Sequence, residues 1–277
     1  MRLVIAASLI AALLATAGAV AVALAAGEKK ASDEQTAPAA QPAGEKLLVF
    51  VLAGQSNMQG SGEGAKLPAQ LKAPQKDVLV FDGKGWQPLK PGGRFGPEVT
   101  FGRDMAKALG RPVGIIKFAV GGTNLAYNWH PKVAKNLYAK TLALVNAAKK
   151  SRPIEIAGML WMQGERDSLF AGMAEKYAAN LKELVTSARK DYEAPQMPFV
   201  LGRVNPPARY KFAGKVRKAQ QEIAEPKTAW IDCDDLPKHR DNLHYNTQGQ
   251  ITLGERFAAA ILKLMGKEAP QSEPAKP

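Results

Sequence analysis

Ser56 ends a short apolar segment, and its position gives it the chemistry of a nucleophile. Residues 47–60 read LLVFVLAGQSNMQG, so a run rich in Leu, Val and Phe leads directly into a glycine and a serine. A serine on a tight turn between a strand and a helix exposes its hydroxyl and its own N–H on one side, which suits covalent catalysis. Serine is also favoured at helix N-caps, so this loop alone leaves capping as the alternative.

A nucleophilic serine needs a base, because its hydroxyl attacks poorly at neutral pH. The chain has three histidines, His130, His239 and His244. His244 stands in DNLH, three residues after Asp241, and in a turn this spacing lets the carboxylate bind Nδ1–H while Nε2 faces the serine. Aspartate and histidine are common in loops, so a structural role for the pair is the alternative.

Acyl transfer also requires hydrogen-bond donors aimed at the oxyanion. The segment VGGTN offers backbone N–H groups at Gly121 and Gly122, and WMQGERD offers the side-chain amide of Gln163. A tight turn would explain the two glycines equally well. Hydrogen bonds between loops would explain the glutamine.

Two acidic residues follow Gln163, and their role is open. Glu165 and Asp167 can form an ion pair with Arg166, bind a cation, or supply a second carboxylate to the histidine. A metal is the weakest of these alternatives, because one cysteine and three scattered histidines do not make a zinc site. We therefore predict no metal site.

The four segments together are harder to explain as capping, and they resemble a known family. GQSNM, AVGGT, WMQGE and DNLH are similar to the four blocks of the SGNH hydrolase superfamily, and more narrowly to its sialate O-acetylesterase and acetylxylan esterase branch. The resemblance covers about residues 47–265. It implies that Ser56 is the nucleophile, His244 the base and Asp241 its orienting acid. It also implies an oxyanion hole made by the N–H groups of Ser56 and Gly121 and the side chain of Gln163.

One residue departs from the wider superfamily pattern, which has Asn where this chain has Gln163. Glutamine is one methylene longer and donates equally well. The branch also leaves the acid member open, because the Glu of QGE is proposed to support the histidine in some members. Glu165 is therefore our second candidate acid. The chemistry that the resemblance implies needs no cofactor.

The expected activity is that of a serine esterase that removes O-acetyl groups from a glycan, xylan or sialic acid through an acetyl-enzyme. The alternatives are an SGNH lipase or thioesterase acting on longer acyl chains, and a non-catalytic carbohydrate-binding protein of the same fold. Tyr127, Asn128, Trp129 and His130 follow the glycine loop and are candidates for a sugar-stacking wall, with core packing as the alternative. The predicted substrate-binding residues are Gln55, Asn57, Gly122, Thr123, Asn124, Trp129 and Arg203.

Short apolar runs alternate with helical patterns along the chain, and this alternation must bring the loops together. The predicted strands lie near 47–53, 78–81, 113–119, 155–161, 198–202 and 228–232. A predicted helix over 173–189 places its apolar residues on one stripe. The strands are almost continuously apolar, which indicates an α/β fold: a three-layer α/β/α sandwich with a mainly parallel, flavodoxin-like sheet. Ligands bind such sheets at the carboxyl ends of the strands.

The chain divides into four parts. Residues 1–26 have the layout of a signal peptide, with Arg2 before a long apolar run, so we expect export to the periplasm or outside the cell. The run is also long enough for an uncleaved membrane anchor. Residues 27–46 read as a disordered linker, 47–266 as the esterase domain and 267–277 as a disordered tail. Cys233 is the only cysteine, so the chain has no intramolecular disulfide, and its apolar neighbours predict that it packs in the core.

The net charge of +13 would fit a nucleic acid, an anionic surface or an acidic polysaccharide as partner. The basic residues are scattered over the polar faces of predicted helices, which is typical of a solvated surface. We therefore predict an acetylated carbohydrate as partner, and acidic groups on that carbohydrate are an open option. We predict no nucleic-acid partner and no membrane contact beyond an N-terminal anchor. The sequence makes no prediction of oligomeric state.

Overall fold

The computed structural model describes residues 45–269. The predicted signal peptide or anchor at 1–26, most of the linker at 27–46 and the tail from residue 270 lie outside the described residues. No helix within 45–269 has both the length and the apolar character needed to cross a membrane.

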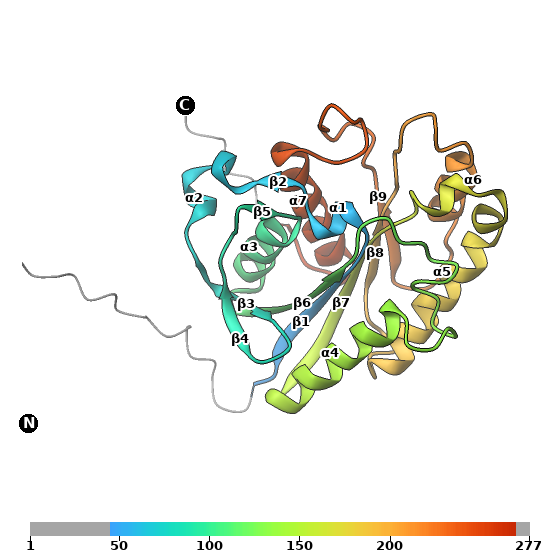
Figure 1. Ribbon diagram of the computed structural model, residues 1–277. Helices are drawn as coiled ribbons and strands as arrows, with labels where there is room; N and C mark the ends of the chain where they lie inside the picture. Colours follow the sequence, from blue (N-terminus) through green and yellow to red (C-terminus); the bar gives the residue numbers. More distant parts are fainter. Residues whose placement is uncertain (1–44, 270–277) are drawn as a thin grey trace, which may run out of the picture. The chain divides into compact units, whose positions relative to one another are not determined.

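A seven-stranded sheet organises the domain (Figure 1). Its strands, in spatial order, are β4 (Trp86–Leu89), β3 (Gln75–Phe81), β6 (Val113–Ala119), β1 (Leu47–Gly54), β7 (Ile154–Met162), β8 (Phe199–Gly202) and β9 (Thr228–Ile231). All neighbours pair in parallel except β3 and β4, which form an antiparallel edge. A separate two-stranded sheet joins β2 (Gly62–Glu63) to β5 (Arg94–Phe95).

Helices cover both faces of the sheet, which gives the three-layer α/β/α sandwich that the sequence predicts. One layer contains α3 (Glu98–Leu109) and α7 (Thr247–Leu264), which pack on each other. The other contains α4 (Leu137–Ser151), α5 (Ala171–Asp191) and α6 (Ala213–Gln221), as Figure 1 shows. Shorter helical segments are α1 (Ser56–Gln59), η1 (Gly64–Lys66), α2 (Ala69–Lys72) and η2 (Asp167–Leu169).

The six predicted strands and the predicted helix are all present within a few residues of their expected bounds. The edge strand β4 and the small β2–β5 sheet were not predicted. These strands are short and half-exposed, with a proline in β4, so they lack the continuous apolar run that marks the central strands.

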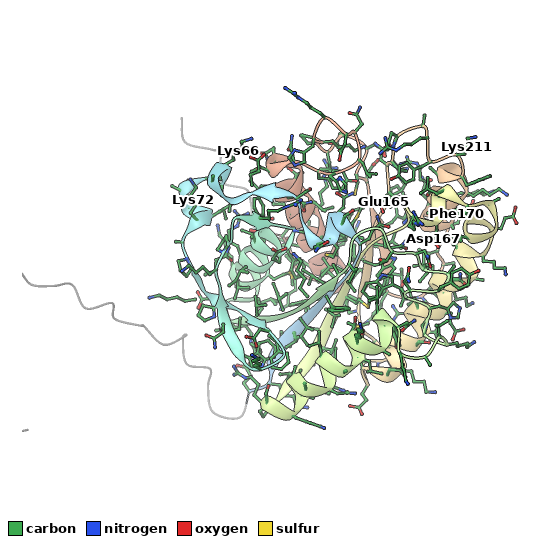
Figure 2. All side chains as sticks on the ribbon, viewed as in Figure 1. Lys66, Lys72, Glu165, Asp167, Phe170 and Lys211 are labelled. Carbon is green, nitrogen blue, oxygen red and sulfur yellow. The ribbon has the colours of Figure 1, made fainter. Side chains whose placement is uncertain are left out.

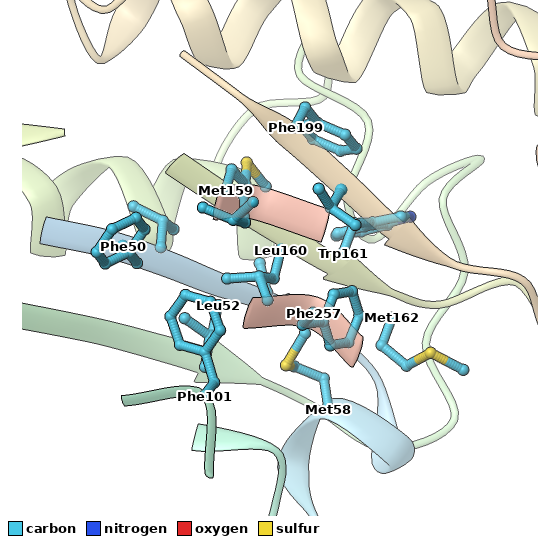
Figure 3. Close-up of a cluster of buried hydrophobic side chains, with 14 of the residues drawn as sticks. Phe50, Leu52, Met58, Phe101, Met159, Leu160, Trp161, Met162, Phe199 and Phe257 are labelled. Atoms are coloured by element: carbon cyan, nitrogen blue, oxygen red, sulfur yellow. The ribbon is translucent and has the colours of Figure 1, made fainter. Parts of the chain in front are cut away.

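The core fills both sides of β1 and β7, because side chains on both faces of these strands are buried. Phe50 of β1 meets Phe101 of α3 edge to face, with ring centroids 5.2 Å apart. Figure 3 shows these rings with Met159 and Phe199, which extend the cluster toward β8. Cys233 is also buried, as its neighbours predict, and burial raises its pKa to about 12.

The order of the strands places β1 at the centre, between β6 and β7. The chain reaches β3 and β6 on one side of β1 and then crosses to β7, β8 and β9 on the other. Such a switch point leaves a crevice at the carboxyl ends of the central strands. The loops after β1, β6 and β7 must therefore meet there.

Candidate active site

The turn after β1 presents Ser56 as the first residue of α1, not as its cap. Gln55 is the N-cap residue, and its side chain makes no capping hydrogen bond. Gly54 has φ +147°, and a Cβ there would lie 2.1 Å from the carbonyl oxygen of Met162. Only glycine fits so close to β7 in this conformation. The sharp turn thus frees the serine hydroxyl for a contact outside the helix.

Ser56, His244 and Asp241 form a hydrogen-bonded chain. His244 Nε2 lies 3.0 Å from Ser56 Oγ, and His244 Nδ1 lies 2.6 Å from Asp241 Oδ2. Ser56 and His244 are 188 positions apart in the sequence, and Asp241 belongs to the same loop as His244. This is the arrangement in which an imidazole removes the serine proton while a carboxylate holds its tautomer.

Asp241 is oriented by the turn that it begins. Its Oδ1 accepts hydrogen bonds from the N–H groups of Leu243, at 2.9 Å, and His244, at 3.0 Å. Partial burial opposes ionisation, yet these two N–H groups and the imidazole together lower the pKa of Asp241 to about 2. Asp241 is therefore a carboxylate at any pH near neutrality.

Two backbone N–H groups of the site, those of Ser56 and Gly121, lie on adjacent loops. A Cβ on Gly121 would lie 3.6 Å from the Cβ of Ser56, so the glycine loop and the serine are adjacent. The ladder hydrogen bonds stop just before them, at Gln55 N–H and Val120 N–H. Within the described residues, the N–H groups of Ser56 and Gly121 donate to no protein acceptor. They are available to an oxyanion.

Gln163 lies beside these groups, but its amide is already engaged. The side chain is fully buried, and Nε2 donates to Asp167 Oδ2 at 2.6 Å, to Thr123 O at 2.9 Å and to Gln55 Oε1 at 3.3 Å. The two amide hydrogens thus face three protein acceptors. A role as the third oxyanion donor requires the amide to exchange one of these partners.

Glu165 does not touch the histidine in this structure. It is 2% exposed, and its Oε1 accepts a hydrogen bond from Asn57 Nδ2 at 2.9 Å. Burial raises the pKa of Glu165, although the Asn57 hydrogen bond and the nearby imidazole oppose the shift. The carboxylate that bonds His244 is therefore that of Asp241.

Asp167 supports the loop after β6 and does not pair with Arg166. It is buried, and it accepts hydrogen bonds from Leu125 N–H and Ala126 N–H as well as from Gln163. Burial raises the pKa of Asp167 against these bonds. Arg166 instead lies over the ring of Phe170. In Figure 2, Glu165 and Asp167 lie inward of Phe170.

No group of three or more His, Cys, Asp or Glu residues that could hold a metal ion occurs in the part of the chain that the structure describes. Gln55 and Asn57, predicted to bind substrate, are 3% and 1% exposed. Their side chains bond other loops of the site: Gln55 Oε1 also accepts from Arg166 N–H. Gly122 is exposed with φ +70°. Asn124 caps its own loop by accepting from Tyr127 N–H and Asn128 N–H.

Trp129 lies in the core, so the prediction that it stacks on a sugar was wrong. It is 1% exposed and packs edge to face on Trp161 and Phe118, while its Nε1 donates to Thr123 Oγ1 at 2.8 Å. A ring buried to this extent has no face left for a sugar, and its N–H has found the partner that a buried indole needs. Tyr127, at 60% exposed, is the aromatic residue of this loop that faces solvent.

Arg203 is neutralised by the protein itself and does not offer a free charge to a substrate. Its guanidinium pairs with Asp232 at 2.7 Å and Asp234 at 2.6 Å and lies over the Trp230 ring at 4.8 Å. The side chain is 9% exposed. The sequence indicated an arginine after β8 but could not show which acids would reach it from the loop after β9.

Several residues that hold the loop at 238–246, called the catalytic loop below, were not predicted. Ser61 Oγ donates to Tyr245 O at 2.5 Å, and the ring of His239 hydrogen-bonds Ser61 O at 3.0 Å. His239 N–H donates to His244 O across the loop, and Lys238 pairs with Tyr245 as an isolated bridge. These partners lie far apart in the sequence and belong to no motif, so only the fold reveals them.

Comparisons with known proteins identify the family. Residues 46–263 match the family described as carbohydrate esterase, sialic acid-specific acetylesterase. A probable carbohydrate esterase of Arabidopsis thaliana is 29% identical over 240 residues, which is 77% of this chain and 90% of that protein.

Solved structures of other proteins have a similar fold. An Arabidopsis thaliana protein structure superposes with a TM-score of 0.71 at 26% identity and covers 79% of this chain and 99% of that one. The structure of a carbohydrate acetylesterase from Xanthomonas citri shares the fold, with a TM-score of 0.63, 18% identity and coverage of 78% and 56%. The chain therefore belongs to the carbohydrate esterase, sialic acid-specific acetylesterase family, and it is a carboxylic ester hydrolase.

Proposed function

We propose that this protein removes O-acetyl groups from carbohydrates through an acetyl-enzyme on Ser56. The observation that carries the proposal is the chain of contacts from Ser56 Oγ through His244 to Asp241, at 3.0 and 2.6 Å. The family match, the name of the Arabidopsis thaliana relative and the described site all support a carbohydrate ester as substrate.

In the first half of the reaction, His244 Nε2 takes the proton of Ser56 as Oγ attacks the acetyl carbonyl. The N–H groups of Ser56 and Gly121 hold the negative oxygen of the tetrahedral intermediate. Gln163 joins them if its amide leaves one of its three acceptors. The intermediate collapses when the C–O bond to the sugar breaks, and the sugar oxygen takes the proton from His244.

In the second half, a water molecule attacks the acetyl-enzyme and gives its proton to His244. Collapse of this second intermediate breaks the bond to Ser56 Oγ, which recovers the proton, and acetate leaves. Asp241 stabilises the imidazolium in both halves because it is already ionised. No step in this sequence needs a cofactor.

The direct test is Ser56→Ala, assayed with a chromogenic acetate ester. We expect turnover to fall by about 10⁴-fold or more, because removal of a triad nucleophile leaves only the contribution of the oxyanion hole and binding. Circular dichroism and thermal unfolding serve as the control for folding. A variant that keeps the wild-type rate would refute the assignment of Ser56.

The acyl group and the sugar are tested separately. A series of chromogenic esters from acetate to long acyl chains distinguishes an acetylesterase from a lipase or thioesterase, because the latter would prefer the longer chains. A panel of acetylated xylans, sialic acids and acidic polysaccharides, with Ser56→Ala as control, then identifies the sugar. Acetate release from none of the panel would favour the non-catalytic carbohydrate-binding alternative.

An acidic substrate and export remain parts of the proposal. Arg203 is paired, but Lys238, His239 and Arg240 of the catalytic loop line a pocket together with Lys66 and Glu63. Lys66 pairs with Glu63 at 2.9 Å, and Lys238 donates to Asn205 O. Arg240 is exposed, and within residues 45–269 no ion pair to it is found. An exposed arginine next to Asp241 in the sequence supports recognition of a carboxylate or sulfate on the glycan.

Residues 1–26 have the layout of a signal peptide and support export, which fractionation of the native host would test.

A further inference from the structure

Asn57 is the residue after the nucleophile, yet its side chain points away from the open site toward the catalytic loop. It is 1% exposed. Its Nδ2 donates to Leu243 O at 3.1 Å, and its Oδ1 accepts from Tyr245 N–H at 3.1 Å. Leu243 and Tyr245 are the two neighbours of His244. One side chain thus holds the backbone on both sides of the base.

Glu165 completes the hydrogen bonding of this amide. Asn57 Nδ2 has two hydrogens, and the second goes to Glu165 Oε1 at 2.9 Å. If the amide were turned over, its oxygen would face the Leu243 carbonyl and the Glu165 carboxylate, which are both acceptors. Its nitrogen would face the Tyr245 N–H, which is a donor. All three contacts therefore select the same orientation of Asn57, and the carboxylate strengthens a choice that the two backbone groups also make.

Asn57 supplies the side-chain hydrogen bond to the buried Glu165 carboxylate. Among the described residues, the other oxygen, Oε2, is buried and has no hydrogen-bond partner. A buried carboxylate is costly unless it is hydrogen-bonded, and here the N–H of Glu165 itself and the Asn57 amide both favour the charged form. Meanwhile His244 Nδ1 is taken by Asp241 at 2.6 Å.

We propose that Asn57 and Glu165 form a positioning pair, in which Glu165 fixes the Asn57 amide and Asn57 holds His244 against Ser56. The inference rests on the proposed function, since it concerns the same nucleophile and base. It assigns Glu165 a role other than that of a second acid on the imidazole. The two roles differ in what Gln must do at position 165, because Gln keeps an acceptor for Asn57 but lacks the charge.

The experiment measures hydrolysis of a chromogenic acetate by the wild type, Asn57→Ala, Glu165→Gln, Glu165→Leu and the double variant Asn57→Ala/Glu165→Leu. We expect Asn57→Ala and Glu165→Leu each to lower kcat by about 10- to 100-fold, because a small displacement of the base is enough for such a loss. KM should stay within about threefold. Glu165→Gln should stay within about fivefold of the wild type.

Two further readouts separate positioning from charge. The double variant should lose no more than Asn57→Ala alone, because both changes break one unit. The acid-side midpoint of the kcat/KM profile against pH should move less in Glu165→Gln than in Asp241→Asn, because Asp241 and not Glu165 bonds the imidazole. Multiplying losses in the double variant, equal losses in Glu165→Gln and Glu165→Leu, or a midpoint that moves as far in Glu165→Gln as in Asp241→Asn would each overturn the pair.

Labelling of Ser56 by a fluorophosphonate keeps this test apart from that of the proposed function. The probe forms a phosphorus–oxygen bond to Ser56 and releases fluoride, and His244 takes the serine proton. The labelling rate therefore reports the serine, the histidine and the oxyanion donors without requiring an acetyl ester. If the probe labels the wild type but the wild type hydrolyses no acetyl ester, the acetylesterase proposal is refuted. The labelling rates of the Asn57 and Glu165 variants would then still test the positioning pair. No labelling of the folded wild type would overturn both. If Glu165→Leu fails to fold, Glu165→Ala, which admits water, replaces it with the same expectation.

Discussion

Two regions of the site have opposite surroundings: the catalytic loop at 238–246, which is exposed around Asp241, and the largely buried segment at 161–167. In the loop, the Asp241 side chain is 42% exposed and its pKa is lowered to about 2. In the buried segment, Glu165 is 2% exposed and its pKa is raised. Both acids lie near one histidine. Hydrogen bonds, not proximity alone, decide which of them orients it, and the exposed region performs the chemistry that the buried one supports.

The largest expected effect comes from Asp241→Asn. The amide presents a donor or a neutral oxygen where the carboxylate held Nδ1–H, so the imidazole loses its tautomer and its stabilising charge. We expect kcat to fall by about 10²- to 10⁴-fold with the fold intact. Asp235→Asn is the matched control, since Asp235 is also exposed and pairs with Arg256, away from the imidazole. A loss of kcat no greater than in that control would move the orienting role away from the loop.

Trp129 tests the buried region, because it packs on Trp161. Trp129→Ala should reduce the free energy of unfolding by about 3–5 kcal/mol, the usual cost of emptying a large aromatic site. Where the protein stays folded, KM for glycans should change little. Tyr127→Ala is the converse control: that ring is 60% exposed, so we expect a small change in stability. Urea unfolding measures the free energy of unfolding of both variants. A strong rise in KM for glycans in Trp129→Phe would contradict the assignment of Trp129 to the core.

Much of this organisation could be predicted from the sequence, for a physical reason. Strands covered on both faces leave continuous apolar runs, and the loops after them carry GQSNM, VGGTN and WMQGERD. The local spacing of Asp241 and His244 was enough to predict their contact, because both belong to one turn. Ser56 could be predicted as nucleophile only together with them.

What could not be predicted depends on partners distant in the sequence. Nothing near Trp129 says that Trp161 will cover it, and nothing near Arg203 says that Asp232 and Asp234 will neutralise it. Asn57 was predicted to contact substrate. Its burial against the loop after β9 follows from strand order, which local patterns do not contain.

The pH dependence of stability should have opposite signs for the two acids. The pKa of Asp241 is lowered from 3.8 to about 2, so its contribution is present above about pH 4 and is lost as the pH falls toward 2. The advantage of the wild type over Asp241→Asn should vanish over that range. It should be a few tenths of a kcal/mol, because the group is exposed to solvent.

Glu165 has its pKa raised above 4.5, so ionisation destabilises the folded state as the pH rises from that value. Glu165→Gln should therefore gain stability relative to the wild type with increasing pH. Urea unfolding from pH 2 to 8 measures both differences in one series. Curves with the same slope for the two variants would remove the electrostatic contrast between the regions.

The smallest effect concerns the two arginines and the charge of the substrate. Arg203 is paired and 9% exposed, whereas Arg240 is exposed and lies next to Asp241. If the glycan is acidic, Arg240→Gln should weaken kcat/KM by about two- to threefold at low salt, and added salt should reduce the difference by screening. Arg203→Gln should change stability more than it changes substrate preference, because its partners are within the protein. A neutral acetyl ester is the control substrate. Equal salt responses for acidic and neutral substrates would show that the exposed loop does not select by charge, and the net charge of +13 would then belong to the solvated surface alone.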